Sequence, residues 1–132
     1  MVKNKYGAKK VVMPDGTTFD STKEFTRWCE LKLLERAGKI SDLQRQVKYN
    51  LLPAITETYE RYSTKTGKRL KDGVVTIEKE CNYIADFVYR DNETGETVVE
   101  DVKGYKNGAG YSLFVLKRKM MLHFHGIRIM EV

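Results

Sequence analysis

Cysteine is scarce in this chain, and so are long hydrophobic runs. Only Cys29 and Cys81 occur in 132 residues, too few for a disulfide framework, so we expect a reducing, cytoplasmic environment. The longest apolar run covers a few residues, as in 113–116, whereas a membrane span needs about 20. Residues 1–5 contain no apolar stretch typical of a secretory signal, so we expect none. These absences predict a small cytoplasmic protein that does not meet a membrane.

Charge is plentiful and divided into blocks. There are 24 Lys and Arg against 18 Asp and Glu, a formal net charge of +6. Residues 1–10, 61–79 and 103–119 carry +4, +4 and +5, whereas residues 80–101 carry −6. Basic blocks favour a polyanionic partner, most commonly nucleic acid, although a solubilising surface charge is the alternative. The acidic block is more informative, because carboxylates repel phosphate unless a cation lies between them.

The hydrophobic pattern predicts one α/β domain over residues 1–132. A short strand or hairpin at 11–19 precedes a helix that begins after Ser21 and ends at Gly38. Ser21-x-x-Glu24 fits a capping box at its start. Strands are expected at 43–52, 81–90, 97–103 and 127–132, and a second helix at 112–124. Residues 54–80 are polar and rich in turn signals, and we expect a protruding β-hairpin there. The core order is therefore helix, three strands, helix, strand.

Asp86, Asp101 and Lys103 form the most distinctive chemical pattern. Side chains two apart on a strand point to one face, so Asp101 and Lys103 share a face and hairpin pairing can bring Asp86 beside them. Two adjacent carboxylates raise each other's pKa unless a cation neutralises them, and Mg²⁺ suits two carboxylates with water and phosphate. The alternative makes Asp86 a polar residue at a strand end and Asp101–Lys103 a surface ion pair.

The order Asp86, hairpin, Glu100-Asp101-Val102-Lys103 resembles the PD-(D/E)XK nuclease superfamily, in particular its small phage-encoded members. A preceding helix with an acidic residue, here Glu24, is also a feature of that superfamily. Ala85 precedes Asp86, where the motif PD-(D/E)XK has proline. Members of the superfamily vary at this position. The resemblance covers nearly the whole chain except 54–80. It implies a restriction-endonuclease-like core: a mixed central sheet flanked by helices, with a three-stranded antiparallel meander.

The resemblance also implies roles for individual residues. Asp86 and Asp101 would bind Mg²⁺, for which Mn²⁺ would substitute, and the backbone carbonyl of Val102 would join them. Lys103 would be the catalytic lysine. Glu24 would complete the metal shell, although its capping-box position is a competing explanation.

Two further polar residues are possible accessories. Gln46 resembles a polar neighbour of the active site in related proteins, with a solvent-facing strand residue as the equal alternative. Glu100 would replace Asp101 only if the strand register slipped, which the two-residue period disfavours.

Together with these residues, the resemblance implies a Mg²⁺-dependent DNA endonuclease, with structure-selective cutting of Holliday junctions or other branched DNA as the preferred activity. We expect it to be phage-encoded, to act in the bacterial host cytoplasm during DNA replication or recombination, and to form a homodimer. The alternatives are a nicking, flap or single-strand nuclease, and a non-catalytic nucleic-acid-binding module. The lysines expected to contact DNA are Lys3, Lys5, Lys9, Lys10, Lys106, Lys117 and Lys119. For Lys106 a flexible connector, and for Lys117 and Lys119 a solvated helix face, are the alternatives.

Overall fold

The computed structural model describes residues 10–104 and 106–132. It divides into two compact units. One comprises Met1–Val47 with Ile84–Val132, and the other comprises Lys48–Tyr83. The first unit contains the residues predicted for the site.

The first helix begins and ends where the sequence predicts. It is preceded by the paired strands β1 (Val11–Val12) and β2 (Thr18–Phe19). Helix α1 spans Thr22–Arg36, and the hydroxyl of Ser21 accepts a hydrogen bond from the backbone N–H of Glu24 at 3.1 Å. Gly38 follows with φ of 77°, the left-handed conformation that glycine adopts most readily after a helix. The Ser21 half of the predicted capping box and the terminating glycine are therefore confirmed, whereas the Glu24 carboxylate accepts from the Asp20 N–H instead of from Ser21.

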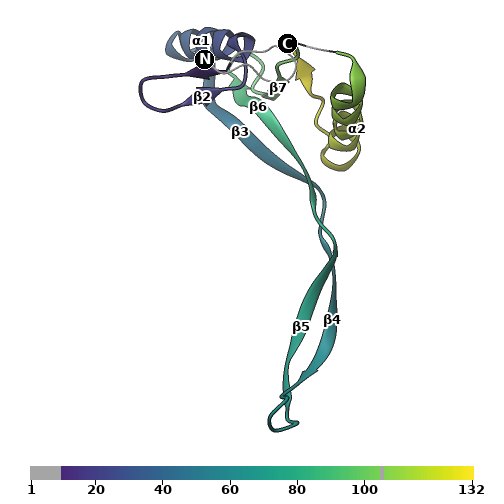
Figure 1. The fold of residues 1–132 in the computed structure, drawn as a ribbon. Coiled ribbons are helices and arrows are strands. Elements are labelled where there is room, and N and C mark those ends of the chain that lie inside the picture. The colour runs from purple at the N-terminus through teal and green to yellow at the C-terminus, as the bar shows by residue number, and fades with distance from the viewer. Residues whose placement is uncertain (1–9, 105) are drawn as a thin grey trace. The chain divides into compact units, whose positions relative to one another are not determined.

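The central sheet has four strands in the order β3-β6-β7-β8 (Figure 1). These are β3 (Ile40–Leu52), β6 (Cys81–Asp91), β7 (Thr97–Asp101) and β8 (Met130–Glu131). Strands β6 and β7 pair antiparallel, whereas β7 and β8 pair parallel, so the sheet is mixed. With the helices α1 and α2 (Gly108–His125), it confirms a mixed α/β fold.

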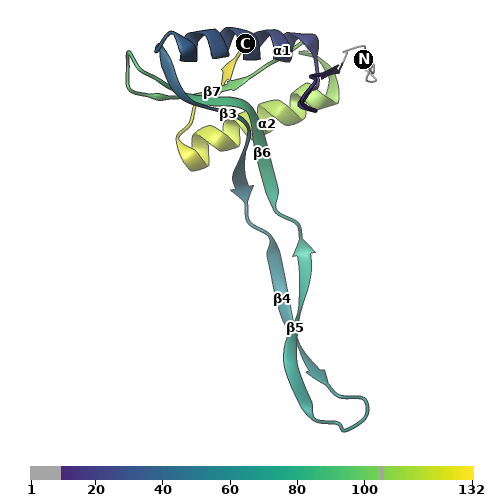
Figure 2. The same cartoon turned by 90° about the vertical axis from the view of Figure 1, so that its left-hand side faces the viewer.

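The sheet lies between the two helices in both ribbon views (Figures 1 and 2). On the α1 side, the buried side chains of Leu31, Ile40, Phe87 and Tyr89 form a core cluster. Trp28 of α1 stacks on Phe87 of β6 with ring centroids 6.1 Å apart. Burial of each such side chain stabilises the fold by about 1.5–3 kcal/mol relative to exposure. Helix α2 contributes the buried residues Phe114 and Met121.

Several predicted boundaries are wrong. Strand β3 begins at Ile40 rather than at residue 43, and α2 begins at Gly108 rather than at residue 112. The low helix propensity of Gly108 and Gly110 concealed that first turn. Strand β7 ends at Asp101 rather than 103, and β8 covers two residues rather than 127–132. The chain beyond Asp101 is held instead by Val132, whose C=O accepts from the Lys103 N–H at 3.0 Å.

The second unit contains the hairpin predicted at 54–80. Strands β4 (Ile55–Tyr62) and β5 (Arg69–Glu78) pair antiparallel and form a two-stranded ribbon (Figure 2). Every residue of β4 is exposed, and Gly73 is the one buried residue of β5. The Tyr59 ring lies directly over Gly73, where a Cβ atom would come within 2.2 Å of it. The hairpin thus has almost no core of its own.

Candidate active site

Lys103 and Asp101 form an ion pair at the end of β7. The Lys103 ammonium lies 2.7 Å from Asp101 Oδ1 and 3.7 Å from the centroid of the Phe114 ring in α2. The backbone of Lys103 is held on both sides, because its C=O also accepts a 2.6 Å bond from the Lys23 ammonium. Both side chains are largely buried. The cation is therefore fixed rather than solvated.

Asp86 lies on the neighbouring strand, close to this pair. The register pairs Phe87 with Glu100, so Asp86 and Asp101 are the next residues along the two strands. Asp86 Oδ2 accepts a 2.8 Å hydrogen bond from the backbone N–H of Val102. Burial, followed by the negative charge of Asp101, raises the pKa of Asp86 to about 7. The predicted meeting of Asp86, Asp101 and Lys103 is thus present in the structure.

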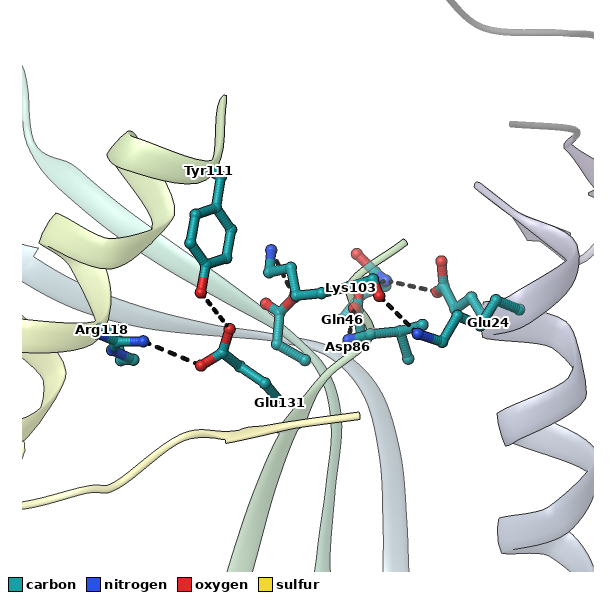
Figure 3. A network of polar contacts seen from close by, with 10 residues as sticks. Glu24, Gln46, Asp86, Lys103, Tyr111, Arg118 and Glu131 are labelled. Atoms are coloured by element: carbon teal, nitrogen blue, oxygen red, sulfur yellow. Dashed lines mark hydrogen bonds and ion pairs between the residues drawn. The ribbon is translucent and has the colours of Figure 1, made fainter. Parts of the chain in front are cut away.

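Gln46 connects two carboxylates from different elements (Figure 3). Its side-chain amide donates to Glu24 Oε1 at 3.2 Å and to Asp86 Oδ1 at 3.3 Å. Its backbone has φ of 51°, in the left-handed region, within strand β3. A non-glycine residue there carries a conformational cost of about 1–2 kcal/mol. Gln46 is exposed, as expected of a solvent-facing strand residue. Its hydrogen bonds to Glu24 and Asp86 also make it a polar neighbour of the site.

Glu24 serves both as a cap residue and as a neighbour of the site. Its backbone N–H donates a hydrogen bond to the Ser21 hydroxyl. Its carboxylate accepts a 3.3 Å hydrogen bond from the backbone N–H of Asp20, whereas in a capping box it would accept one from the N–H of Ser21. The side chain is buried, and its other oxygen faces Gln46. Burial, followed by the charge of Asp20, raises the pKa of Glu24. The capping-box interpretation of Glu24 thus holds only for its backbone N–H, and its carboxylate lies beside Gln46 at the site.

A cavity of about 410 Å³ opens beside Glu24. Arg45 contributes to its wall, with its guanidinium 3.9 Å above the Phe19 ring and 3.7 Å from Glu24 Oε1. Sequence reasoning missed Arg45, because its contacts arise between distant segments and no local pattern marks it. The lining residues are Thr17, Thr18, Asp20, Glu24, Arg45 and Gln46.

Glu100 is engaged elsewhere. It is fully buried, accepts two 2.7 Å hydrogen bonds from the Arg27 guanidinium, and accepts a further bond from the Tyr89 hydroxyl. This network raises the pKa of Arg27, and burial and Glu100 together raise that of Tyr89. The structure therefore does not bring Glu100 to Lys103, in agreement with the two-residue period.

The lysines predicted to contact DNA are only partly described. Lys10, Lys106 and Lys119 are exposed, and Lys117 is half-buried. Lys3, Lys5 and Lys9 lie outside the described residues. Between Lys117 and Lys119, Arg118 donates to Glu131 at 3.0 Å, and Tyr111 donates to the same carboxylate at 2.8 Å (Figure 3). Arg118 is thus committed to holding β8 against α2.

The donor chemistry of the site fits Mg²⁺. Within residues 10–104 and 106–132, no three His, Cys, Asp or Glu side chains are arranged to hold a metal ion. Mg²⁺ in proteins, however, is usually bound by one or two carboxylates together with waters and substrate phosphates. Asp86 and Asp101 are such a pair, and burial, followed by the negative charge of Asp101, raises the pKa of Asp86 although Lys103 lies beside Asp101.

Comparison with known protein families identifies the family of this chain. The family described as "Protein of unknown function (DUF1064)" matches residues 3–130. The chain belongs to the DUF1064 family. No curated protein and no solved structure matches it significantly. Among the described residues of this DUF1064 protein, no helix combines the length and apolar character that crossing a membrane requires.

Proposed function

We propose that this DUF1064 protein is a Mg²⁺-dependent DNA endonuclease. The observation that supports the proposal most strongly is the meeting of Asp86, Asp101 and Lys103 at the end of β7. Two carboxylates beside a fixed ammonium group suit the hydrolysis of a phosphodiester, in which negative charge develops at the phosphate. The resemblance to the PD-(D/E)XK superfamily includes the same three positions.

Asp86 and Asp101 would hold the metal, and Glu24 would do so through water or directly. Bound Mg²⁺ would supply positive charge at the scissile phosphate and lower the pKa of an attacking water. Within the chain, the Val102 N–H fixes one oxygen of Asp86, and the Gln46 amide fixes the other. This orientation would leave the site ready for the substrate without reorganisation.

Lys103 would neutralise charge on the phosphate during cleavage. Its ammonium contacts Asp101 and the face of Phe114, which would hold it in place at the site. Its backbone is tied to Lys23 and Val132. A preorganised charge of this kind stabilises a transition state more effectively than one that must first be ordered.

The finer proposal is that branched DNA, such as a Holliday junction, is the substrate. Two copies of the chain related by a two-fold axis would place two sites on symmetric strands. We further propose that the protein is phage-encoded and works in the cytoplasm of the bacterial host.

A non-catalytic nucleic-acid-binding module is the second candidate. It is favoured because both carboxylates already have partners within the protein. Lys103 forms an ion pair with Asp101, and the Gln46 amide donates a hydrogen bond to Asp86. In this case the cluster would stabilise the fold, and DNA would contact the basic residues without being cut.

A panel of DNA substrates separates these functions. Purified protein is incubated with Mg²⁺ or Mn²⁺ and with labelled four-way junction, flap, duplex and single-stranded DNA. We expect cutting, with the junction cut fastest. Equal cutting of all substrates would contradict the structure-selective proposal, and binding without any cutting would establish the non-catalytic module.

A further inference from the structure

The tip of the β4–β5 hairpin is strongly basic. Residues 61–71 contain five basic residues and no acidic residue, a formal charge of +5. The acidic residues of the hairpin lie nearer its open end, as Glu57, Glu60, Asp72 and Glu78. The positive charge is therefore concentrated on the turn and on the strand ends that flank it.

Most of these cations have no acidic partner. Arg69 lies 2.8 Å from Asp72 and 4.0 Å from Glu60. In the described part of the chain, by contrast, Arg61, Lys65, Lys68 and Lys71 make no ion pair within 4.0 Å, and all four are exposed. We define these four residues as the tip cations. Their charge is available to a partner.

The turn itself is ordered by its own hydrogen bonds. The Ser63 N–H donates to the Lys68 C=O at 2.8 Å, and the Gly67 N–H donates to the Ser63 C=O at 2.9 Å. The Ser63 hydroxyl also accepts from the N–H groups of Lys65 and Thr66, each at 3.2 Å. Lys65 and Lys68 are thus displayed on a defined turn, and Arg61 and Lys71 lie on the strand ends that flank it. This order reduces the entropy cost when a partner binds.

We propose that the hairpin tip binds the phosphate backbone of duplex DNA through the tip cations. A two-stranded ribbon fits the major groove of B-form DNA, which is about 12 Å wide. The major groove of duplex RNA is too narrow to admit it. This inference rests on the proposed function, because DNA is the partner in both. It adds a second DNA-contacting region, in the unit that carries none of the predicted site residues.

The test measures the salt dependence of DNA binding by the full chain. The variant replaces all four tip cations (Arg61→Gln, Lys65→Gln, Lys68→Gln, Lys71→Gln). Its matched control removes four exposed cations of the other unit that make no ion pair in the described structure (Arg36→Gln, Lys39→Gln, Arg90→Gln, Arg128→Gln). Circular dichroism checks that both fold. Fluorescence anisotropy with a labelled 30-base-pair duplex then gives the Kd at a series of salt concentrations from 50 to 200 mM. EDTA is present so that no cleavage occurs.

We expect the slope of log Kd against log salt to fall by about 1 for each phosphate that the tip variant no longer neutralises, about 3–4 in total. The control should change the slope by less than about 1. An unchanged slope in the tip variant would overturn the proposal, as would an equally large decrease in the control. A decrease seen only with duplex RNA would overturn it too.

The outcome is separable from that of the proposed function. If the wild-type protein binds DNA through the tip but never cuts, the tip proposal stands and the nuclease proposal fails. If the wild-type protein cuts and the tip variant keeps its salt slope, the nuclease proposal stands and the tip proposal fails.

Discussion

The ammonium of Lys103 lies 2.7 Å from Asp101 Oδ1, at the point where β7 leaves the sheet. The pair is largely buried, and the ring of Phe114 covers the ammonium. A structural ion pair and a catalytic pair would share this geometry. They differ in what happens when one partner is neutralised, and this difference leads to the first prediction.

Asp101→Asn should abolish cleavage, lowering its rate by about 100-fold or more, the order found for removal of a group that stabilises a transition state. DNA affinity in EDTA should be kept or rise, because a negative charge is removed. Single-turnover cleavage and anisotropy measure the two effects. If the ion pair is purely structural, Asp101→Asn should instead lower the thermal stability and leave the cleavage rate of the folded protein unchanged.

Glu100 provides the contrast, because it precedes Asp101 and yet belongs to another network. Removing one partner of a buried ion pair costs about 3–5 kcal/mol. Glu100→Ala should therefore lower the free energy of unfolding by that order, since the guanidinium of Arg27 and the hydroxyl of Tyr89 lose their shared acceptor. Denaturant titration measures the decrease. The cleavage rate per folded molecule should stay within about two-fold, and a specific loss of cleavage would place Glu100 in the site.

Asp86 should make the metal-free protein less stable as the pH rises. Its folded pKa of about 7 lies above the unfolded value of about 3.9. The folded state thus binds the proton more tightly, so this contribution to stability is complete below pH 4 and is lost as the pH rises through 7. In EDTA at pH 8, Asp86→Asn should be more stable than wild type by about 1–3 kcal/mol, a value discounted for partial exposure.

Thermal unfolding between pH 4 and 8 measures this effect. The advantage of Asp86→Asn should shrink toward pH 4, and exposed Glu57→Gln should show no such trend. A stability advantage that does not depend on pH would contradict the assigned pKa.

Gln46 should matter for cleavage more than for stability. Glycine at this position relieves the left-handed strain of about 1–2 kcal/mol but makes the unfolded chain more flexible by about 0.5–1 kcal/mol. Gln46→Gly should consequently unfold within about 1 kcal/mol of wild type, whereas cleavage should fall by about 10-fold because Asp86 and Glu24 lose a shared donor.

Asp42→Gly is the matched control for Gln46→Gly. Asp42 lies in the same strand with φ of 57°, and it is exposed. Its replacement should leave cleavage unchanged. Equal cleavage by both glycine variants would show that the Gln46 amide does not orient the site.

The sequence predicted those parts of the molecule that depend on local or period-two patterns. Ser21 and Gly38 mark the ends of α1 through capping chemistry, and the pairing of β6 with β7 is enough to bring Asp86 to Asp101. These features require only the residues themselves and their neighbours in the chain. Lys103 lies beyond the end of β7, and its backbone is held by Val132 and Lys23.

The remaining features depend on contacts between distant segments. Lys23 bonds to the carbonyl of Lys103, 80 residues later, and Arg45 packs on Phe19 across 26 residues. The left-handed backbone of Gln46 likewise has no signature in a strand sequence, because glycine and asparagine are the residues that favour it. Tertiary structure decides such features, so sequence patterns do not reveal them.

Comparing wild type with Lys103→Met on a labelled four-way junction in Mg²⁺ tests the central claim most directly. Methionine keeps much of the packing against Phe114 while removing the charge, and EDTA anisotropy confirms that the variant still binds DNA. We predict that wild type cuts the junction and that Lys103→Met does not, at equal DNA occupancy. Cutting by Lys103→Met at the wild-type rate, or no cutting by wild type with either Mg²⁺ or Mn²⁺, would contradict the account.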